Sequence, residues 1–320
     1  MIEKLKKVAP YLLSILLIAL IIYLLGDQRQ ELTKIFQLSA HIIAFVVGIF
    51  LLFQAGQAMV LKLMLKSAEQ DIGYWRAFRL ICLRSFFNYL PLNAGMVSVG
   101  VLIKRSSGLP FSRYFGMMTG IVFISLLSHG IVGAVTLLFG WQNFSSAGMI
   151  LIPIVSALLV IPLILIFVPL PRFENKGRIT NLILQFKTGW EVLRQHKLLV
   201  LAIMSLQIVM LFGMSVRFWL IAGDLNLSIS FIAIIFVNIF GNILRVNTIF
   251  PGNWGMSEAV AGTVAATLAF DFMDGFLPAV VDHLISMIII FLFGIPLTFF
   301  YTHRITRNNK GSIFSSESAS

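Results

Sequence analysis

The sequence predicts an all-α polytopic membrane protein with about six full transmembrane helices and two re-entrant helical hairpins in an inverted repeat. Three observations predict this fold. The 320 residues are 58% hydrophobic and only 12% charged, whereas soluble domains carry about twice that share of charge. Several uncharged apolar runs are long enough to cross the roughly 30 Å of hydrocarbon in a bilayer. Two further apolar regions contain the same pattern, Pro-x-Asn-x-Gly-Met.

Six uninterrupted apolar runs are predicted to span the membrane. They lie at about 8–25, 40–61, 114–140, 148–168, 198–222 and 276–301. The first is predicted to be an uncleaved helix, because it is long enough to span and shows no small-residue cleavage site. Together the spans form one integral-membrane domain, 1–302. The polar, Ser-rich tail at 303–320 is expected to be cytoplasmic and disordered.

The repeated pattern interrupts two apolar regions, at 75–103 and 228–270. It reads PLNAGM at 91–96 and PGNWGM at 251–256. The arms on either side are short for full spans, which favours re-entrant hairpins, although pairs of short spans give the same parity. Non-helical backbone at membrane depth is tolerated only where protein or a water-filled cavity surrounds it. The residues predicted to break the helices are Pro91, Gly95, Pro251, Gly252 and Gly255.

The breaks belong to repeat-like halves at about 75–140 and 228–294. In each half a long apolar run follows the break, contains a His and ends in Leu-Phe-Gly. Three full spans lie between the hairpins, so the second hairpin enters from the opposite face. Inverted repeats with broken helices are typical of secondary transporters and predict one central cavity. The alternative is that the breaks are structural kinks.

The basic residues predict the orientation. In this arrangement nearly all of the 24 Lys and Arg residues fall on the side that holds both termini. Because short cytoplasmic loops are rich in Lys and Arg, both termini are predicted to be cytoplasmic and the protein to lie in the inner (cytoplasmic) membrane. The same bias accounts for most of the formal net charge of +11, so no nucleic-acid partner is needed.

Ionisable residues inside the predicted membrane region form a first candidate site. Arg217, Arg245, Glu258, Asp282 and His283 are expected to cluster in the outer half of the membrane. Arg245 and Glu258 flank the second break and are expected to form an ion pair. Intramembrane ionisable groups are costly and usually functional, which favours a substrate or proton site. A structural salt-bridge network is the alternative.

A cationic patch around the first break forms a second candidate site. Arg79, Arg84, Asn88 and Asn93 lie there without an acidic neighbour in the sequence. Such a patch suits a phosphate at the cytoplasmic face. The alternative is that the two arginines extend to the lipid headgroups. Asn253 in the second break either binds a headgroup or only caps a broken helix.

Sequence signatures of enzymes are missing. The chain contains no Gly-rich phosphate loop, His-Glu-x-x-His or Gly-x-Ser-x-Gly pattern. The single cysteine, Cys82, excludes an internal disulfide and a cysteine-based metal cluster. We therefore expect neither enzyme activity nor a cofactor or metal.

Two stretches carry a resemblance to a known family: NYLPLNAGMVSVGVLIKRSSGLPFSR (88–113) and FPGNWGMSEAVAG (250–262). The chain resembles the transmembrane region of lysylphosphatidylglycerol synthetases, also called flippase-like domain proteins, over nearly its whole length. The second stretch is the more specific. The family's Pro-Gly-Gly-x-Gly and following Glu-Ala are matched here by Pro251, Gly252, Gly255, Glu258 and Ala259.

The resemblance implies an integral inner-membrane protein that handles a lipid headgroup, such as that of an aminoacylated phospholipid. Relatives are also linked to polyprenyl- or dolichyl-phosphate sugar pathways. The first stretch departs from the family, which often has an acidic residue after the Gly and an Arg soon afterwards; this chain has Met96 and then 97–100, Val-Ser-Val-Gly. Bifunctional relatives continue into a soluble aminoacyl-transfer domain. This chain ends soon after its last predicted helix, so we expect no synthesis of lysyl-lipid.

Three functions fit the sequence. The first is a translocator that moves an anionic, aminoacylated or polyprenyl-phosphate-linked lipid through a cavity between the hairpins, with membrane lipids as its partners. The second is a non-transporting accessory subunit of a lipid-modifying or glycosyltransferase pathway. The third is an intramembrane enzyme that uses Asp282 and His283 on a lipid. The sequence predicts no oligomeric state.

Overall fold

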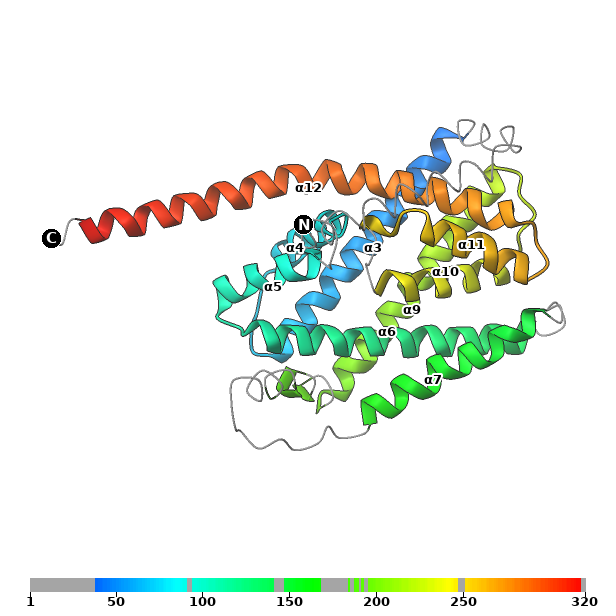
Figure 1. Cartoon of the computed structure of the whole chain (residues 1–320), viewed down its shortest axis with the longest axis horizontal. Helices are drawn as coiled ribbons and strands as arrows, with labels where there is room; N and C mark the ends of the chain where they lie inside the picture. The colour runs from blue at the N-terminus through cyan, green and yellow to red at the C-terminus, as the bar shows by residue number, and fades with distance from the viewer. Residues whose placement is uncertain are drawn as a thin grey trace, which may run out of the picture.

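The computed structural model describes residues 38–90, 94–140, 147–167, 196–246 and 251–317, with isolated positions between 184 and 195. At 140, 147, 244–246, 251 and 302–317 it describes the main chain but not the side chains. All regular secondary structure within these ranges is helical (Figure 1). The predicted first span at 8–25 lies outside the described residues, as do Pro91 and Asn93.

Five helices of the described chain are long and apolar enough to cross a membrane. They match five of the predicted spans, and the prediction of a multi-pass helical membrane protein is confirmed. The five are α3 (Ala40–Ser67), α6 (Phe111–Gly140), α7 (Leu151–Phe167), α9 (Lys197–Asp224) and α12 (Phe272–Glu317). A short 3-10 helix, η4 (Ala147–Ile150), precedes α7.

Four shorter helices form two packed pairs, one pair around each predicted break. Helix α4 (Tyr74–Phe87) packs against α5 (Ala94–Ser107), and α10 (Phe231–Val246) packs against α11 (Met256–Thr267). They contain 14, 14, 16 and 12 residues. At 1.5 Å per residue each is roughly 18–24 Å long, which is less than the thickness of the hydrocarbon core.

Local geometry accounts for the second break and for a close helix contact beside the first. In the second, η5 (Pro251–Asn253) contains Gly252 at φ 63° and Asn253 at φ 56°, and Gly255 follows at φ 80°. Glycine reaches this left-handed region freely and asparagine tolerates it. In the first, a methyl group on Gly95 would lie 2.2 Å from the carbonyl oxygen of Arg84. A side chain at Gly95 would therefore prevent the close approach of α5 to α4.

The long helix that follows each break makes matching contacts. Helix α6 packs against α5 of its own half and against α10 of the other half. Helix α12 packs against α11 of its own half and against α4 of the other half. The two broken regions therefore lie between α6 and α12, in the middle of the molecule (Figure 1).

Side-chain hydrogen bonds connect several helix ends. Ser39, before α3, donates through its amide and its hydroxyl to Asp224 at the end of α9, at 2.7 and 2.8 Å. Ser228, before α10, donates to Asp274 in the first turn of α12 at 3.2 Å. The starts of α3, α10 and α12 and the end of α9 lie at the same end of the molecule, on the right of Figure 1.

Helix α12 continues past its apolar span, which ends at Tyr301, as far as Glu317. Figure 1 shows this end projecting away from the other helices. A helix without tertiary packing is only marginally stable in water. The disorder expected for the tail at 303–320 therefore stays a prediction.

Candidate functional site

The two breaks meet through a main-chain hydrogen bond. The N–H of Gly252 in η5 donates to the carbonyl oxygen of Asn88, the residue after α4, at 3.0 Å. A methyl group on Gly252 would lie 2.6 Å from the ring of Tyr89. Glycine therefore permits both the left-handed turn and the close approach of the two segments. This contact brings residues far apart in the sequence to one point.

A cavity of about 330 Å³ lies beside this contact. Its volume falls at the lower end of the range for ligand pockets, about 300–1,000 Å³. Part of the apolar wall consists of the flexible, polarisable side chains of methionines, which adapt to the shape of a ligand. These are Met96, Met118, Met210 and Met214. The polar lining residues are Gln54, Gln57, Arg84, Ser85, Asn88, Tyr89, Ser125, His129, Gln207, Arg217, Asn242, Asn253, Asp282, His283 and Ser286.

Arg84 lines the cavity from α4 with a neutral amide as its partner. Its Nη2 donates to Oε1 of Gln57 on α3 at 3.1 Å. The next residue, Ser85, is hydrogen-bonded to the amide of Gln54 at 3.1 and 3.3 Å. Among the described residues no carboxylate forms an ion pair with Arg84. An amide does not neutralise a guanidinium, so the cavity carries a positive charge that an anion can compensate.

Arg217 on α9 and Asp282 on α12 form a bidentate ion pair at the cavity. Two guanidinium nitrogens contact the two carboxylate oxygens. The side chains are 4% and 8% exposed, and the guanidinium lies 5.3 Å from the ring centroid of Phe50. Charges inside a membrane are stable only when they are paired or hydrated. The pair therefore contributes no net charge to the cavity.

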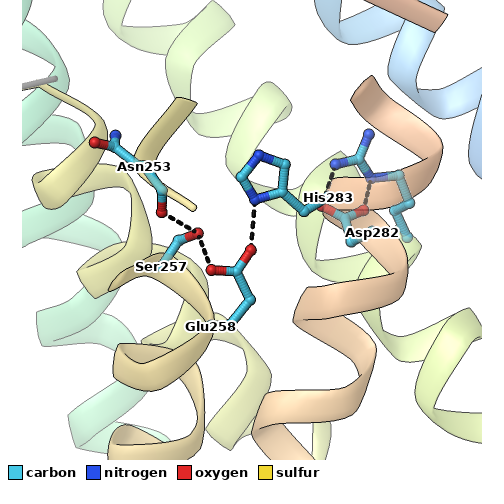
Figure 2. Close-up of polar contacts among 6 residues, drawn as sticks. Asn253, Ser257, Glu258, Asp282 and His283 are labelled. Atoms are coloured by element: carbon cyan, nitrogen blue, oxygen red, sulfur yellow. Dashed lines mark hydrogen bonds and ion pairs between the residues drawn. The ribbon is translucent and has the colours of Figure 1, made fainter. Parts of the chain in front are cut away.

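His283, the next residue of α12, contacts Glu258 on α11 (Figure 2). Its Nδ1 lies 2.5 Å from Glu258 Oε1, and the side chains are 10% and 2% exposed. Ser257 donates to the other carboxylate oxygen at 3.0 Å. Trp254 stacks on the imidazole with ring centroids 4.4 Å apart. Figure 2 shows the second ring nitrogen of His283 turned away from Glu258.

Two buried polar atoms at the cavity have no hydrogen-bond partner within the described part of the chain. They are Oδ1 of Asn253, whose side chain is 3% exposed, and Oγ of Ser286 on α12. Leaving a buried polar group unpaired costs about 1–3 kcal/mol. Such groups call for a ligand or water as partner.

His129 on α6 lines the cavity but has both ring nitrogens engaged. Its Nδ1 lies 2.5 Å from the carbonyl oxygen of Ser125, so this nitrogen carries the proton and donates it. Its Nε2 accepts from the side-chain amide of Asn242 on α10 at 3.1 Å. These partners match a neutral imidazole.

The family comparison covers both breaks and the cavity. The model of the family described as "Lysylphosphatidylglycerol synthase TM region" matches residues 11–294. The chain belongs to this family. Membership identifies a membrane protein with a lipid-related, flippase-like role. Comparison with curated proteins and with solved structures gives no match.

In this family member the two groups of predicted site residues share one cavity, although they were expected in different halves of the membrane. Glu258 lies directly behind His283. Asn93 and the side chain of Arg245 lie outside the described residues, so the expected Arg245–Glu258 ion pair stays a prediction. The predicted residues that line the cavity are Arg84, Asn88, Arg217, Asn253, Asp282 and His283.

Arg79 does not line the cavity, although the sequence groups it with Arg84. Its Nε donates to the carbonyl oxygen of Trp75 at 3.3 Å, and its guanidinium lies 5.9 Å from the ring centroid of Phe300. Within the described ranges, no group of three or more His, Cys, Asp and Glu side chains is placed to hold a metal ion.

Sequence reasoning missed several polar residues of the site. Gln54 and Gln57 are three residues apart within an apolar span, and Ser125 and His129 are four apart. Such spacings put both members on one helix face. Polar residues in transmembrane helices usually face the interior of the bundle, so this pattern was available as a signal. Ser286 follows Asp282 by four residues and His283 by three, so the same signal was available for it.

Proposed function

We propose that this protein moves a lipid with an anionic headgroup across the cytoplasmic membrane and that the phosphate passes through the cavity at the two breaks. The lipid is an anionic, aminoacylated or polyprenyl-phosphate-linked lipid. The observation that carries the proposal is Arg84, a cation at a cavity of about 330 Å³ whose described partner is the neutral amide of Gln57. Guanidinium and phosphate oxygens form strong charge-assisted hydrogen bonds.

We also propose that the two broken regions are re-entrant hairpins in an inverted repeat. Four observations support it. Each short helix is less than a full span, and the Gly252–Asn88 hydrogen bond joins the two breaks. The bond between Ser228 and Asp274 brings the start of α10 close to the end of α11. The contacts of α6 with α10 are mirrored by those of α12 with α4, as expected for a two-fold relation.

The proposed orientation is supported by the charges at the helix ends. Basic residues lie at the ends of α3 and α5, at Lys66, Lys104 and Arg105. Asp224 and Asp274 lie with the starts of α3 and α12 at the other end. By the positive-inside rule the basic end is cytoplasmic, and both termini are proposed to lie on that side.

The size of the cavity suits a headgroup rather than a whole lipid. A volume of about 330 Å³ accommodates a phosphate and a small polar group, while the acyl chains stay in the bilayer. The methionine wall tolerates differences between headgroups. The proposed activity is movement of the lipid, with no covalent step and no cofactor.

The proposal is tested in phosphatidylcholine vesicles that contain the purified full chain and a trace of phosphatidylglycerol labelled on an acyl chain. A membrane-impermeant quencher measures how fast the label leaves the outer leaflet. We expect Arg84→Gln to slow this step by about tenfold or more, because a hydrogen bond to a charged group contributes about 1.5–3 kcal/mol.

Arg79→Gln is the matched control, since it removes the same charge from the same helix away from the cavity. It should keep the wild-type rate. Equal rates for the two variants would remove Arg84 from the proposed path. A wild-type rate equal to that of empty vesicles would overturn translocation and favour the accessory-subunit alternative. That alternative predicts stable co-purification with a lipid-modifying enzyme.

A further inference from the structure

The two histidines at the cavity occupy equivalent places in the two halves but have different partners. Each lies on the long helix after a break, His129 on α6 and His283 on α12. His129 is fixed as a neutral ring by a carbonyl oxygen and an amide. His283 instead faces a carboxylate, Glu258, and its second ring nitrogen is turned away from that partner (Figure 2). His283 therefore has a nitrogen available for a second proton.

The side chains around His283 are placed to accommodate a positive charge on its ring. Glu258 is 2% exposed, and its second oxygen accepts from Ser257, so the carboxylate is held in place. An imidazolium beside it cancels the buried negative charge, which is expensive inside a membrane. Trp254 stacks on the ring at 4.4 Å, and the face of an indole attracts a cation. Imidazole is also the side chain that exchanges protons between about pH 5 and 8.

Other charges around the cavity decide when the proton binds. Arg217 and Asp282 cancel each other, and α3 contributes the neutral amides Gln54 and Gln57. Arg84 on α4 is the positive charge without a described carboxylate partner, and it opposes a second cation in an empty cavity. The remaining titratable groups facing this space are Tyr89 on α4 and His129 on α6, and on α10 the side chain of Arg245 lies outside the described residues.

An anion bound to Arg84 removes that opposition. The two binding events are thermodynamically linked. If a bound anion increases the affinity of the site for a proton, a bound proton increases the affinity for the anion by the same factor. We propose that the His283–Glu258 pair takes up one proton from water when a phosphate headgroup enters the cavity, so that lipid and proton cross together. This inference rests on the proposed function. One phosphodiester carries one negative charge, so the loaded cavity gains no net charge and the movement is electroneutral.

The test uses the same vesicles with a pH gradient across the membrane and labelled phosphatidylglycerol at equilibrium. Wild-type protein should accumulate the label in the leaflet facing the alkaline side. At one proton per lipid, a gradient of about one pH unit corresponds to a ratio of about tenfold. A potassium diffusion potential should leave this ratio unchanged. His283→Gln and Glu258→Gln should reduce the ratio to about one, whereas His129→Gln should keep it, because the ratio does not depend on rate.

The outcomes separate this inference from the proposed function. Label that exchanges in wild-type vesicles but ignores the pH gradient overturns proton coupling and leaves translocation intact. A gradient response that survives in both His283→Gln and Glu258→Gln overturns the assignment of the pair. If no lipid moves at all, translocation fails, and a second measurement decides the rest. It follows proton uptake by the protein in detergent on addition of glycerophosphoglycerol, the phosphodiester headgroup of phosphatidylglycerol. Uptake by wild-type protein that is lost in His283→Gln supports the proton site; equal uptake, or none, overturns it.

Discussion

The two halves of this protein bring opposite kinds of charge to one cavity. The half built from α4, α5 and α6 contributes Arg84, which is held by the amide of Gln57. The half built from α10, α11 and α12 contributes Glu258 and Asp282, and each of these contacts a basic side chain. Each acidic side chain of the second half therefore has a basic neighbour, Arg217 of α9 for Asp282 and His283 of α12 for Glu258, whereas Arg84 of the first half has no carboxylate partner among the described residues.

The largest expected effect follows from breaking the ion pair of Asp282 with Arg217. Arg217→Gln leaves Asp282 buried and unpaired, and removing one partner of a buried ion pair costs about 3–5 kcal/mol. The double variant Arg217→Gln, Asp282→Asn should recover much of this loss. Arg84→Gln in the other half should change stability far less, because its described partner is a neutral amide. Thermal unfolding in detergent measures all of them, and a loss in Arg84→Gln equal to that in Arg217→Gln would contradict the comparison.

The next effect concerns the first break. Gly95→Ala should lower the free energy of unfolding by about 1–3 kcal/mol, the usual cost of overpacking, because the new methyl group would meet the carbonyl oxygen of Arg84 and the side chain of Asn88 at 2.2 Å. Gly48→Ala in α3 is the control, since a methyl group there meets nothing within 4 Å. We expect that control to be neutral or slightly stabilising in the same unfolding measurement. Equal destabilisation by both would show that contact is not the cause.

At the second break the cause is mainly conformational. Gly252→Ala should cost about 1–2 kcal/mol, because residue 252 has φ 63° and a side chain disfavours that region. Displacement of the Tyr89 ring adds to this cost. The same variant in the background Tyr89→Ala keeps the conformational part and loses the contact, so unfolding of the double variant separates the two causes. If Gly252→Ala does not change the free energy of unfolding in the Tyr89→Ala background, the contact with Tyr89 is the main cause at this break too.

The smallest expected effect concerns the ring that covers His283. Trp254→Phe should lower the free energy of unfolding by about 0.5–1 kcal/mol, since phenylalanine keeps a stacked ring but interacts less strongly with an imidazolium. Tyr89→Phe, whose ring centroid lies 6.1 Å from that of His283, should change stability less. Thermal unfolding in detergent measures both variants. A loss in Trp254→Phe no larger than that in Tyr89→Phe would contradict a stabilising role for the indole.

The sequence was sufficient to predict the five described spans, because each is a long apolar run with at most one charged residue. It also predicted that Arg217 and Asp282 lie close together, since both are at similar depth from the same side of the membrane. It could not predict which side chain Asp282 and which side chain His283 would contact. Asp282 and His283 are consecutive on a helix, so their side chains point about 100° apart. Which neighbour each one reaches depends on how α9 and α11 pack around α12, and no local pattern specifies that packing.

The same limit explains why the two candidate sites were expected to be separate. The position of each residue within its predicted membrane segment places a patch around Arg84 in the inner half of the membrane and a cluster around Asp282 in the outer half. A single cavity joins them because the two breaks end at the same point, where Gly252 contacts Asn88. Hydrophobic patterns give the length of each arm but not the point at which two arms from opposite ends of the molecule meet.

The hydrogen bond between Gly252 and Asn88 joins main-chain atoms. Its donor and acceptor are present whatever side chains occupy the two positions, except that a proline at 252 would remove the donor. Over evolutionary time the side chains that line the cavity can therefore change while the joint between the two breaks persists. A displacement of one half is also passed to the other through backbone rather than through replaceable side chains.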